Sequence, residues 1–523
     1  MISFNFYNGE ILISSSYGYK DRIRELSYRN WDPNLKVWKT TVNNLDEVLE
    51  KFPEASLGDG LVEYINHRKK TTELSRALFS FGKVELGDFG KGKELLPFQK
   101  AGLEFIDLTF GRAIIADDMG LGKTIQALAY LQTYPDIRPA IIVCPASVKF
   151  NWRNEINQWL TTTENLVVID KGKPDISKAS IVIINYDILG KWLPNLKAIN
   201  PEVIIFDESH MLKNSKAART KAAKDLSSEI DHVIALTGTP ILNKPVELFT
   251  QLNIVNPKAY PTNTFFSYAK KYCDGHQNNF GWDFNGSSNL EELSDELKGF
   301  MIRRTKEQVL PELPPKRRTM VLLPMSNRKA YDLAFAEFKA WRAAEEKPYE
   351  RDVLEWLETL KKHCTTGKLT AAKEWVKDFL ETENKLVLFG THQMTIDFFM
   401  KEFKECAVKI DGSTSQKERE RAVYRFQNEE KIKLFVGNIK AAGVGITLTA
   451  ASNVAFMELD WTPALHDQAE DRCNRIGQKT AVNSYYLLAE HTLDANILGM
   501  LENKKNIIAE VMADDKILNF ELI

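Results

Sequence analysis

At 523 residues the chain is too long for a single compact core and suits about three domains. Its 44% hydrophobic and 27% charged residues are typical of an ordinary soluble globular protein. A formal net charge of −2 excludes a general attraction to nucleic acid, so any DNA-binding surface must be a local patch.

The cysteines and the lengths of the apolar runs argue against several classes of protein. The five cysteines lie far apart without a C-x-x-C pair, which argues against a zinc site and a disulfide framework: Cys144, Cys273, Cys364, Cys406 and Cys473. No apolar run approaches the ~18 residues that span a bilayer. Residues 1–10 have neither the basic nor the apolar region of a signal peptide. We therefore expect a protein that does not associate with a membrane.

The first 72 residues are expected to form a small α+β module and a linker. Their tryptophans, Trp31 and Trp38, allow two interpretations. They could form the core of the module, or they could stack on the bases of DNA. The sequence leaves both interpretations open.

Two regions alternate apolar, β-branched runs with helical segments, which is the pattern of buried parallel strands. In residues 93–257 the predicted strands are 111–116, 140–145, 181–186, 203–208 and 232–239. In residues 383–495 they are 386–389, 408–410, 432–436, 454–459 and 485–488. We predict an α/β protein with two tandem, doubly wound parallel sheets.

Two further segments complete the predicted organisation. Residues 258–382 are richer in helix formers and aromatic side chains, so we expect a helical insertion and a linker between the lobes. The chain after Thr492 is typical of a capped helix with Asp494 in its first turn, and we assign 496–523 to this C-terminal helix.

A phosphate-binding loop is predicted between the strand at 111–116 and the helical stretch that follows it. Backbone N–H groups of such a loop face the phosphates, and the helix N-terminus favours negative charge. The residues assigned to the nucleotide are Asp117, Asp118, Met119, Gly120, Leu121, Gly122, Lys123 and Thr124. Since Asp117 replaces the first glycine of the common pattern, a glycine-rich turn is the alternative.

Two carboxylates, Asp207 and Glu208, end another apolar run, where a parallel strand would deliver them beside the phosphates. Alone they would fit a solvated acidic loop, but after a phosphate-binding loop they indicate a nucleotide triphosphatase. Lys123 would neutralise the β- and γ-phosphates, and Thr124 and Asp207 would hold Mg²⁺. Glu208 would orient and deprotonate the attacking water.

The second alternating region carries a pair of arginines three positions apart, Arg472 and Arg475. On a helix both would project from one face. Arginines that one domain presents to a phosphate held by another stabilise transition-state charge. Upstream, residues 443–447 follow a strand and are either a turn or a binding loop.

These motifs stand in the order of the superfamily 2 helicase motifs: Gln99, 117–124, 207–210, 237–240, 443–447 and 468–478. More narrowly, the chain resembles the Swi/Snf-type DNA translocases, whose linker signature is similar to 301–306 and 313–316 and whose pattern 411–414 also matches. Gly437-Asn438 and Asn474 depart from that pattern without removing a catalytic group.

Within this family the chain is most similar to the HARP-type annealing helicases and their small bacterial and phage relatives. Residues 207–214, His392 after Phe389, and 455–461 carry this resemblance. Residues 18–53 resemble the HARP module that precedes the ATPase in those proteins.

The resemblance implies RecA-like lobes and ATP as the nucleotide, with Gln99 at the adenine edge. It implies that His210, the loop Thr237, Gly238 and Thr239, and Gly445 couple the nucleotide to DNA, and that Gln468, Arg472 and Arg475 complete the catalytic site. We expect the DNA track along 146–149, Asn185, Tyr186, 412–414 and Lys440. The basic residues between the lobes either contact phosphates or form a salt-bridged brace: Arg303, Arg304, Lys316, Arg317 and Arg318.

The leading function is therefore an ATP-dependent double-stranded DNA translocase that remodels or reanneals branched DNA, with ATP and Mg²⁺ as cofactors. The alternatives are a motor that displaces proteins from DNA and a weakly hydrolysing DNA-binding switch. Intact Lys123, Glu208, Arg472 and Arg475 argue against the switch. We expect a monomer in the cytoplasm, at the nucleoid of a bacterium, in the host cytoplasm for a phage, or in the nucleus of a eukaryote.

Overall fold

The computed structural model divides into two compact units, Met1–Val309 with Glu510–Asp514, and Leu310–Ala509 with Asp515–Ile523. The structure describes residues 2–7, 10–26, 28–77, 79, 82, 84, 86–87, 89–90, 92–162, 164–170, 172–241, 244–257, 265–278, 281–313, 316–344, 350–382, 385–443, 445–475, 478, 480–512 and 521–522.

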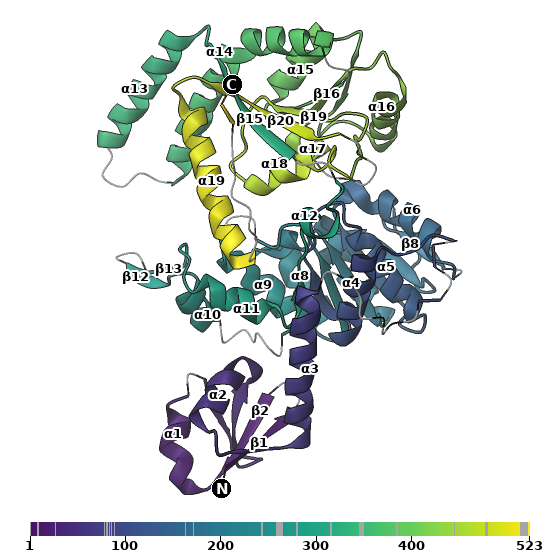
Figure 1. Ribbon diagram of the computed structural model, residues 1–523, viewed down its shortest axis with the longest axis vertical. Coiled ribbons are helices and arrows are strands. Elements are labelled where there is room, and N and C mark those ends of the chain that lie inside the picture. Colours follow the sequence, from purple (N-terminus) through teal and green to yellow (C-terminus); the bar gives the residue numbers. More distant parts are fainter. Residues whose placement is uncertain are drawn as a thin grey trace. The chain divides into compact units, whose positions relative to one another are not determined.

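A small α+β module begins the first unit (Figure 1). Its five-stranded sheet has the order β3-β4-β2-β1-β5, antiparallel except where β5 joins β1. The strands are β1 (Ile2–Tyr7), β2 (Glu10–Ser15), β3 (Asn30–Asp32), β4 (Val37–Thr41) and β5 (Ser56–Leu57), and the helices are α1 (Lys20–Arg24), α2 (Leu45–Lys51) and α3 (Asp59–Arg76). The core residues alternate along β1 and β2, since Ile2, Phe4, Ile11 and Ile13 are buried.

The larger sheet of the first unit is parallel throughout and has the order β14-β6-β11-β10-β7-β9-β8. Its strands are β6 (Arg112–Ile115), β7 (Ala140–Cys144), β8 (Leu166–Val168), β9 (Ile181–Asn185), β10 (Val203–Asp207), β11 (His232–Leu236) and β14 (Met301–Ile302). Helices flank it: α4 (Pro97–Leu108), α5 (Lys123–Thr133), α6 (Lys149–Trp159), α7 (Leu189–Ala198), α8 (Ala218–Ser227) and α9 (Val246–Val255). The continuous apolar runs are fully buried strands, as predicted.

The segment after α9 is mixed rather than purely helical. It contains α10 (Phe265–Tyr272), the antiparallel hairpin β12 (His276–Asn278) and β13 (Gly281–Asp283), α11 (Leu290–Leu297) and α12 (Lys306–Val309). Strand β14 lies between α11 and α12 and joins the edge of the large sheet beside β6. These strands are only two or three residues long, too short for a pattern of apolar residues to predict them.

The second unit also has a parallel seven-stranded sheet, in the order β17-β18-β16-β19-β20-β15-β21. Its strands are β15 (Lys316–Leu323), β16 (Leu386–Gly390), β17 (Ala407–Ile410), β18 (Leu434–Asn438), β19 (Asn453–Phe456), β20 (Val482–Ala489) and β21 (Glu521–Leu522). The helices are α13 (Arg328–Ala344), α14 (Glu350–Thr382), α15 (Gln393–Glu402), α16 (Gln416–Asn428), α17 (Ile439–Ala442), α18 (Pro463–Glu470) and α19 (Leu493–Met512).

The predicted fold class is confirmed: an α+β module and two parallel α/β sheets, each with the strands expected from the sequence. The five predicted domain boundaries remain predictions. Strand β15 was missed because its first three residues, Lys316, Arg317 and Arg318, are basic rather than apolar. Among the described helices, none is long and apolar enough to cross a bilayer.

Candidate nucleotide-binding site

The predicted phosphate-binding loop connects β6 to α5. Gly120 and Gly122 have φ angles of 86° and 78°, a backbone region that side chains disfavour. Lys123 is the first residue of α5, and its Nζ donates to the carbonyl oxygens of Asp117 at 2.7 Å and Asp118 at 3.2 Å. The loop thus folds back around the lysine at a helix N-terminus, as a phosphate site requires.

The two carboxylates lie at the C-terminal end of β10, a central strand of the same sheet. Burial, together with Glu208, raises the pKa of Asp207 to about 6. Burial also lowers the pKa of Lys123, while Glu208 and the neighbouring aspartates oppose that shift. The structure therefore brings the predicted lysine and carboxylates into one electrostatic cluster. Glu208 itself has a φ of 52°, a left-handed conformation that is uncommon outside glycine.

Asp207 is held by two aromatic side chains that the sequence analysis did not assign to the site. The indole Nε1 of Trp152 donates to Oδ2 of Asp207 at 2.7 Å, and the hydroxyl of Tyr186 donates to the Asp207 carbonyl at 2.7 Å. The backbone N–H of Glu208 donates to Oδ1 at 3.0 Å. From the sequence alone, a tryptophan in an amphipathic helix, such as Trp152 in α6, is interpreted as a residue of the hydrophobic core. Only the sheet order, which pairs β7 with β10, shows that α6 carries it to Asp207.

The predicted coupling residues lie in the same cluster. His210 Nδ1 lies 3.3 Å from Oε2 of Glu208 and 3.2 Å from the Thr237 hydroxyl, which in turn accepts from the backbone N–H of Thr239 at 3.1 Å. Burial, with Lys213, lowers the pKa of His210 to about 4, so the ring is neutral at neutral pH. A Cβ on Gly238 would lie 2.6 Å from Met119 Cγ, so this loop packs against the phosphate-binding loop.

Gln99 lies in the first turn of α4 and is buried. Its Oε1 accepts from the backbone N–H of Leu96 at 2.9 Å, and its Nε2 donates to the Leu121 carbonyl at 3.2 Å. The side chain therefore joins the start of α4 to the phosphate-binding loop. Its role at the adenine edge remains a prediction.

In the second unit the two predicted arginines contact the segment that contains Gly445. Arg472 Nη1 donates to the Ile446 carbonyl at 3.4 Å, and its Nε donates to the Gln468 carbonyl at 3.1 Å. Arg475 Nη1 donates to the Thr447 hydroxyl at 2.9 Å. The prediction that both arginines project from a helix is wrong: α18 ends at Glu470, and they lie in the turns that follow. Gly445 has a φ of 71°.

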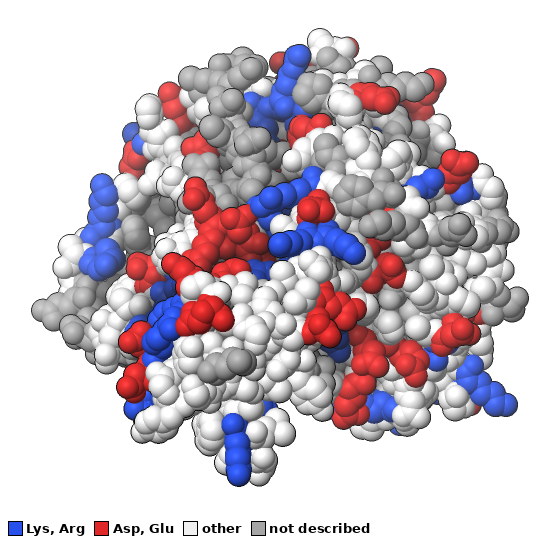
Figure 2. Space-filling model, turned by 60° about the horizontal axis from the view of Figure 1, so that its bottom comes forward, with Lys and Arg blue, Asp and Glu red and all other residues white. Residues whose placement is uncertain are grey.

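Several predicted contacts to DNA are used within the protein instead. Lys149 is buried, with its Nζ 2.8 Å from Asp170 Oδ1, and Tyr186 is buried against Asp207. Neither side chain is open to a duplex as expected. Lys440 is largely exposed, and its Nζ lies 3.2 Å from Oδ2 of Asp460. Basic and acidic side chains are interspersed on the face in Figure 2, in keeping with the small net charge.

Of the two tryptophans in the N-terminal module, Trp31 is exposed and Trp38 is half-buried. Trp31 is 45% exposed, and its ring meets that of Trp38 edge-on with the centroids 5.3 Å apart. The core interpretation of Trp31 is therefore wrong. Three stretches of the predicted motifs, Val444, Ile476-Gly477 and Pro314-Pro315, lie outside the described residues.

Comparison with known proteins identifies the two catalytic halves. Residues 98–369 match the SNF2-related domain, and residues 368–477 match the helicase conserved C-terminal domain. The chain belongs to the SNF2 family. Membership confirms the predicted Swi/Snf-type assignment within helicase superfamily 2 and the predicted ATPase class of the enzyme.

Curated relatives of this SNF2 chain extend over nearly its whole length. It is 35% identical over 510 residues to the "SWI/SNF-related matrix-associated actin-dependent regulator of chromatin subfamily A-like protein 1" of Xenopus tropicalis, covering 93% of the chain and 53% of that protein. The Caenorhabditis elegans homolog is 35% identical over 519 residues, which cover 94% of the chain and 72% of that protein. The human "DNA annealing helicase and endonuclease ZRANB3" is 36% identical over 438 residues, 80% of the chain and 40% of that protein. The chain thus spans about half the length of the Xenopus tropicalis protein and of its Xenopus laevis counterpart.

Proposed function

We propose that this SNF2 protein is a DNA-dependent ATPase that tracks along double-stranded DNA and remodels or reanneals branched DNA. The observation that carries the proposal is the cluster of Lys123, Asp207 and Glu208 at the C-terminal edge of one parallel sheet. The annealing helicase among the relatives supports the DNA-remodelling part.

The chemistry would be hydrolysis of the γ-phosphate of ATP. The N-terminus of α5 and its glycine-rich loop would bind the phosphates, and Lys123 would leave the Asp117 and Asp118 carbonyls to donate to them. Glu208 would accept a proton from the water that attacks the γ-phosphorus, and ADP would leave. Gln468, Arg472 and Arg475 of the second unit would offset the charge of the transition state.

Thr124 and Asp207 fit a magnesium ion. Mg²⁺ is usually held by one or two carboxylates together with phosphate oxygens and water, so a dedicated cage of acidic residues is not required. The described residues contain no such cage. A bound cation would offset the cost of burying the Asp207 charge, which raises the pKa of that carboxyl. When bound, the ion would neutralise charge on the β- and γ-phosphates.

His210 would couple the chemistry to DNA, because its neutral ring lies between Glu208 and Thr237. A displacement of the loop Thr237, Gly238 and Thr239 would shift Glu208, the proposed general base, as well as the phosphate-binding loop. We propose that duplex or branched DNA is the partner that displaces it. The monomeric state and the compartment remain predictions.

The test is steady-state ATP hydrolysis with no DNA, single-stranded DNA, blunt duplex and forked duplex at one salt concentration. We expect stimulation by duplex and most by the fork. Stimulation by single strands alone would indicate a conventional unwinding helicase, and no stimulation by any of the three DNAs would reject the proposal.

A further inference from the structure

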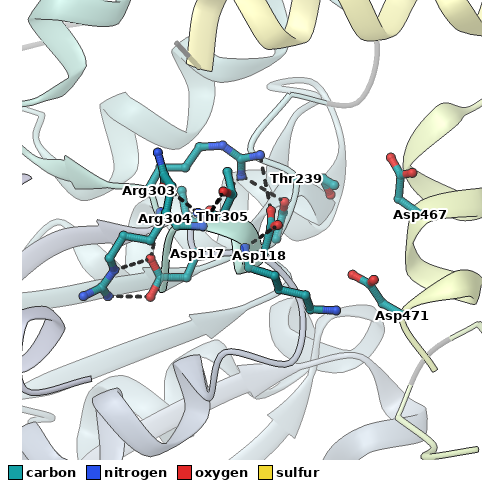
Figure 3. Close-up of polar contacts among 12 residues, drawn as sticks. Asp117, Asp118, Thr239, Arg303, Arg304, Thr305, Asp467 and Asp471 are labelled. Carbon is teal, nitrogen blue, oxygen red and sulfur yellow. Dashed lines mark hydrogen bonds and ion pairs between the residues drawn. The ribbon is translucent and has the colours of Figure 1, made fainter. Parts of the chain in front are cut away.

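The chain that leaves the first unit is fixed to the phosphate-binding loop by two arginines (Figure 3). The buried guanidinium of Arg304 donates to both carboxylate oxygens of Asp117, at 2.9 Å from Nε and 2.5 Å from Nη2, and Nη1 donates to the Phe98 carbonyl. Gln126 Nε2 donates to the same carboxylate at 2.9 Å. Asp117, which takes the place of the first glycine of the common loop, is therefore an anchor for the linker.

The neighbouring side chain, Arg303, joins the phosphate-binding loop to the coupling loop. Its Nη1 donates to the Ala116 carbonyl at 2.9 Å and to the Gly238 carbonyl at 3.4 Å, and its Nη2 lies 3.4 Å from Asp118 Oδ1. The backbone N–H of Lys306 donates to the other Asp118 oxygen at 3.1 Å. The segment 301–306 thus contacts both loops that Lys123 and His210 depend on.

The continuation of the same segment is fixed to the arginine-bearing turns of the second unit. On β15, Arg318 donates to Asp467 at 3.0 Å and to Glu470 at 2.7 Å, and Lys316 forms an ion pair with Asp471. Glu470 is fully buried. Asp467 directly precedes Gln468, and Glu470 and Asp471 lie between Gln468 and Arg472. Strand β15 therefore holds the backbone from which the catalytic arginines project.

The four basic residues resolve the alternatives left by the sequence in favour of internal anchoring. A guanidinium that makes two or more hydrogen bonds to a buried carboxylate is fixed in orientation as well as position. Arg317 lies between Lys316 and Arg318 with its side chain on the opposite, exposed face of β15. A substitution of Arg317 therefore changes the charge of the segment without removing an anchoring contact, and it can serve as a control.

We propose that residues 301–323 are a positioning strap, in which Arg303 and Arg304 hold the phosphate-binding loop and Lys316 and Arg318 hold the turn that carries Arg472 and Arg475. Residues 307–315 connect the two anchored ends. A displacement of either unit on DNA would pass along this short connection to both sets of catalytic residues. The inference rests on the proposed DNA-dependent ATPase.

Lengthening the strap between its anchors tests the proposal without changing any anchor. The insertion is Gly-Ser-Gly-Ser between Pro311 and Glu312, which are both exposed and take part in none of the ion pairs described above. We expect the ratio of DNA-stimulated to basal hydrolysis to fall about tenfold, within the usual range of coupling between sites. The matched control is the same insertion between Ser228 and Glu229, in an exposed turn of the first unit, which we expect to keep the parental ratio.

Point variants test the anchors themselves. Arg303→Gln and Arg318→Gln should each lower the same ratio, Arg303→Lys should restore part of it, and Arg317→Gln should leave it at the parental value. Thermal unfolding of each variant is measured alongside, because a merely structural role would lower basal and stimulated rates together and leave their ratio unchanged.

The outcomes separate the two proposals. If the parent protein is not stimulated by DNA, the proposed function fails. If the parent is stimulated and the Pro311–Glu312 insertion keeps the parental ratio, or Arg303→Gln behaves as Arg317→Gln does, the positioning strap is rejected.

Discussion

The hydrogen bond from Trp152 to Asp207 predicts a specific defect when the indole is replaced. Trp152→Phe keeps an aromatic ring in the core but removes the N–H that donates to Oδ2 at 2.7 Å. A hydrogen bond to a charged group contributes about 1.5–3 kcal/mol, which corresponds to ~10-fold to ~150-fold. Loss of a group that orients a metal ligand has a similar effect, about 10–100-fold in metal affinity or activity. We therefore expect the Mg²⁺ concentration for half-maximal hydrolysis to rise at least about tenfold.

The same helix supplies a matched control. Trp159 is also buried, and its Nε1 donates to Glu155 at 2.9 Å rather than to a residue of the site. Trp159→Phe therefore removes an equivalent group from α6 without touching Asp207. Hydrolysis is measured at saturating ATP over a range of Mg²⁺ concentrations, together with thermal unfolding of both variants. Equal Mg²⁺ dependence of the two variants would refute the assignment of Trp152 as a positioning residue.

Four further predictions concern the site and the N-terminal module. Lys123→Ala and Glu208→Gln should each abolish DNA-stimulated hydrolysis and leave DNA binding largely intact; parental hydrolysis in either variant would contradict the site assignment. Arg475→Ala should reduce hydrolysis about 10³-fold at constant ATP affinity, and loss of ATP binding alone would indicate a structural role instead. Between pH 6.5 and 4 the unfolded chain takes up a proton at His210 that the folded protein does not, since the folded pKa is lowered to about 4. The free energy of unfolding should thus decrease as the pH is lowered through this window, by up to about 3 kcal/mol. His210→Gln should remove that part of the decrease, and identical acid dependence of unfolding in both proteins would rule out the contribution of His210. Removal of residues 1 to about 70 should spare basal hydrolysis but reduce stimulation by forked DNA, and equal stimulation would reject the HARP-like assignment.

The sequence predicted the parts of the site that follow from local pattern. Strand, glycine-rich loop and helix are contiguous around Lys123, and Asp207 ends an apolar run, so both could be placed at the C-terminal edge of a parallel sheet. Parallel sheets bring such ends together whatever the length of chain between them. This is why residues far apart in sequence were assigned to one site.

Contacts between distant segments could not be predicted in this way. Trp152 and Tyr186 reach Asp207 because β7 lies between β9 and β10 in the sheet, and the spacing of residues in the sequence does not encode the order of the strands. Lys149 was assigned to the DNA track, but its side chain is buried and paired within the protein. Its partner, Asp170, is supplied by a separate part of the chain. Charged residues are thus the positions where pattern alone is least informative.

Strand β15 also affects the order in which the protein can assemble. It pairs in parallel with β20 over eight residues, from Lys316 with Val482 to Leu323 with Ala489, and nearly all of the second unit's sequence lies between them. During synthesis β15 emerges long before its partner, and non-local parallel pairing is intrinsically slow. Until β20 has been synthesised, β15 lacks this partner strand. The basic residues at the start of β15 would make pairing with other chains less favourable, as lysines on exposed sheet edges do. Lys316 and Arg318, which anchor β15 in the folded protein, would thereby also reduce aggregation of the chain during its synthesis.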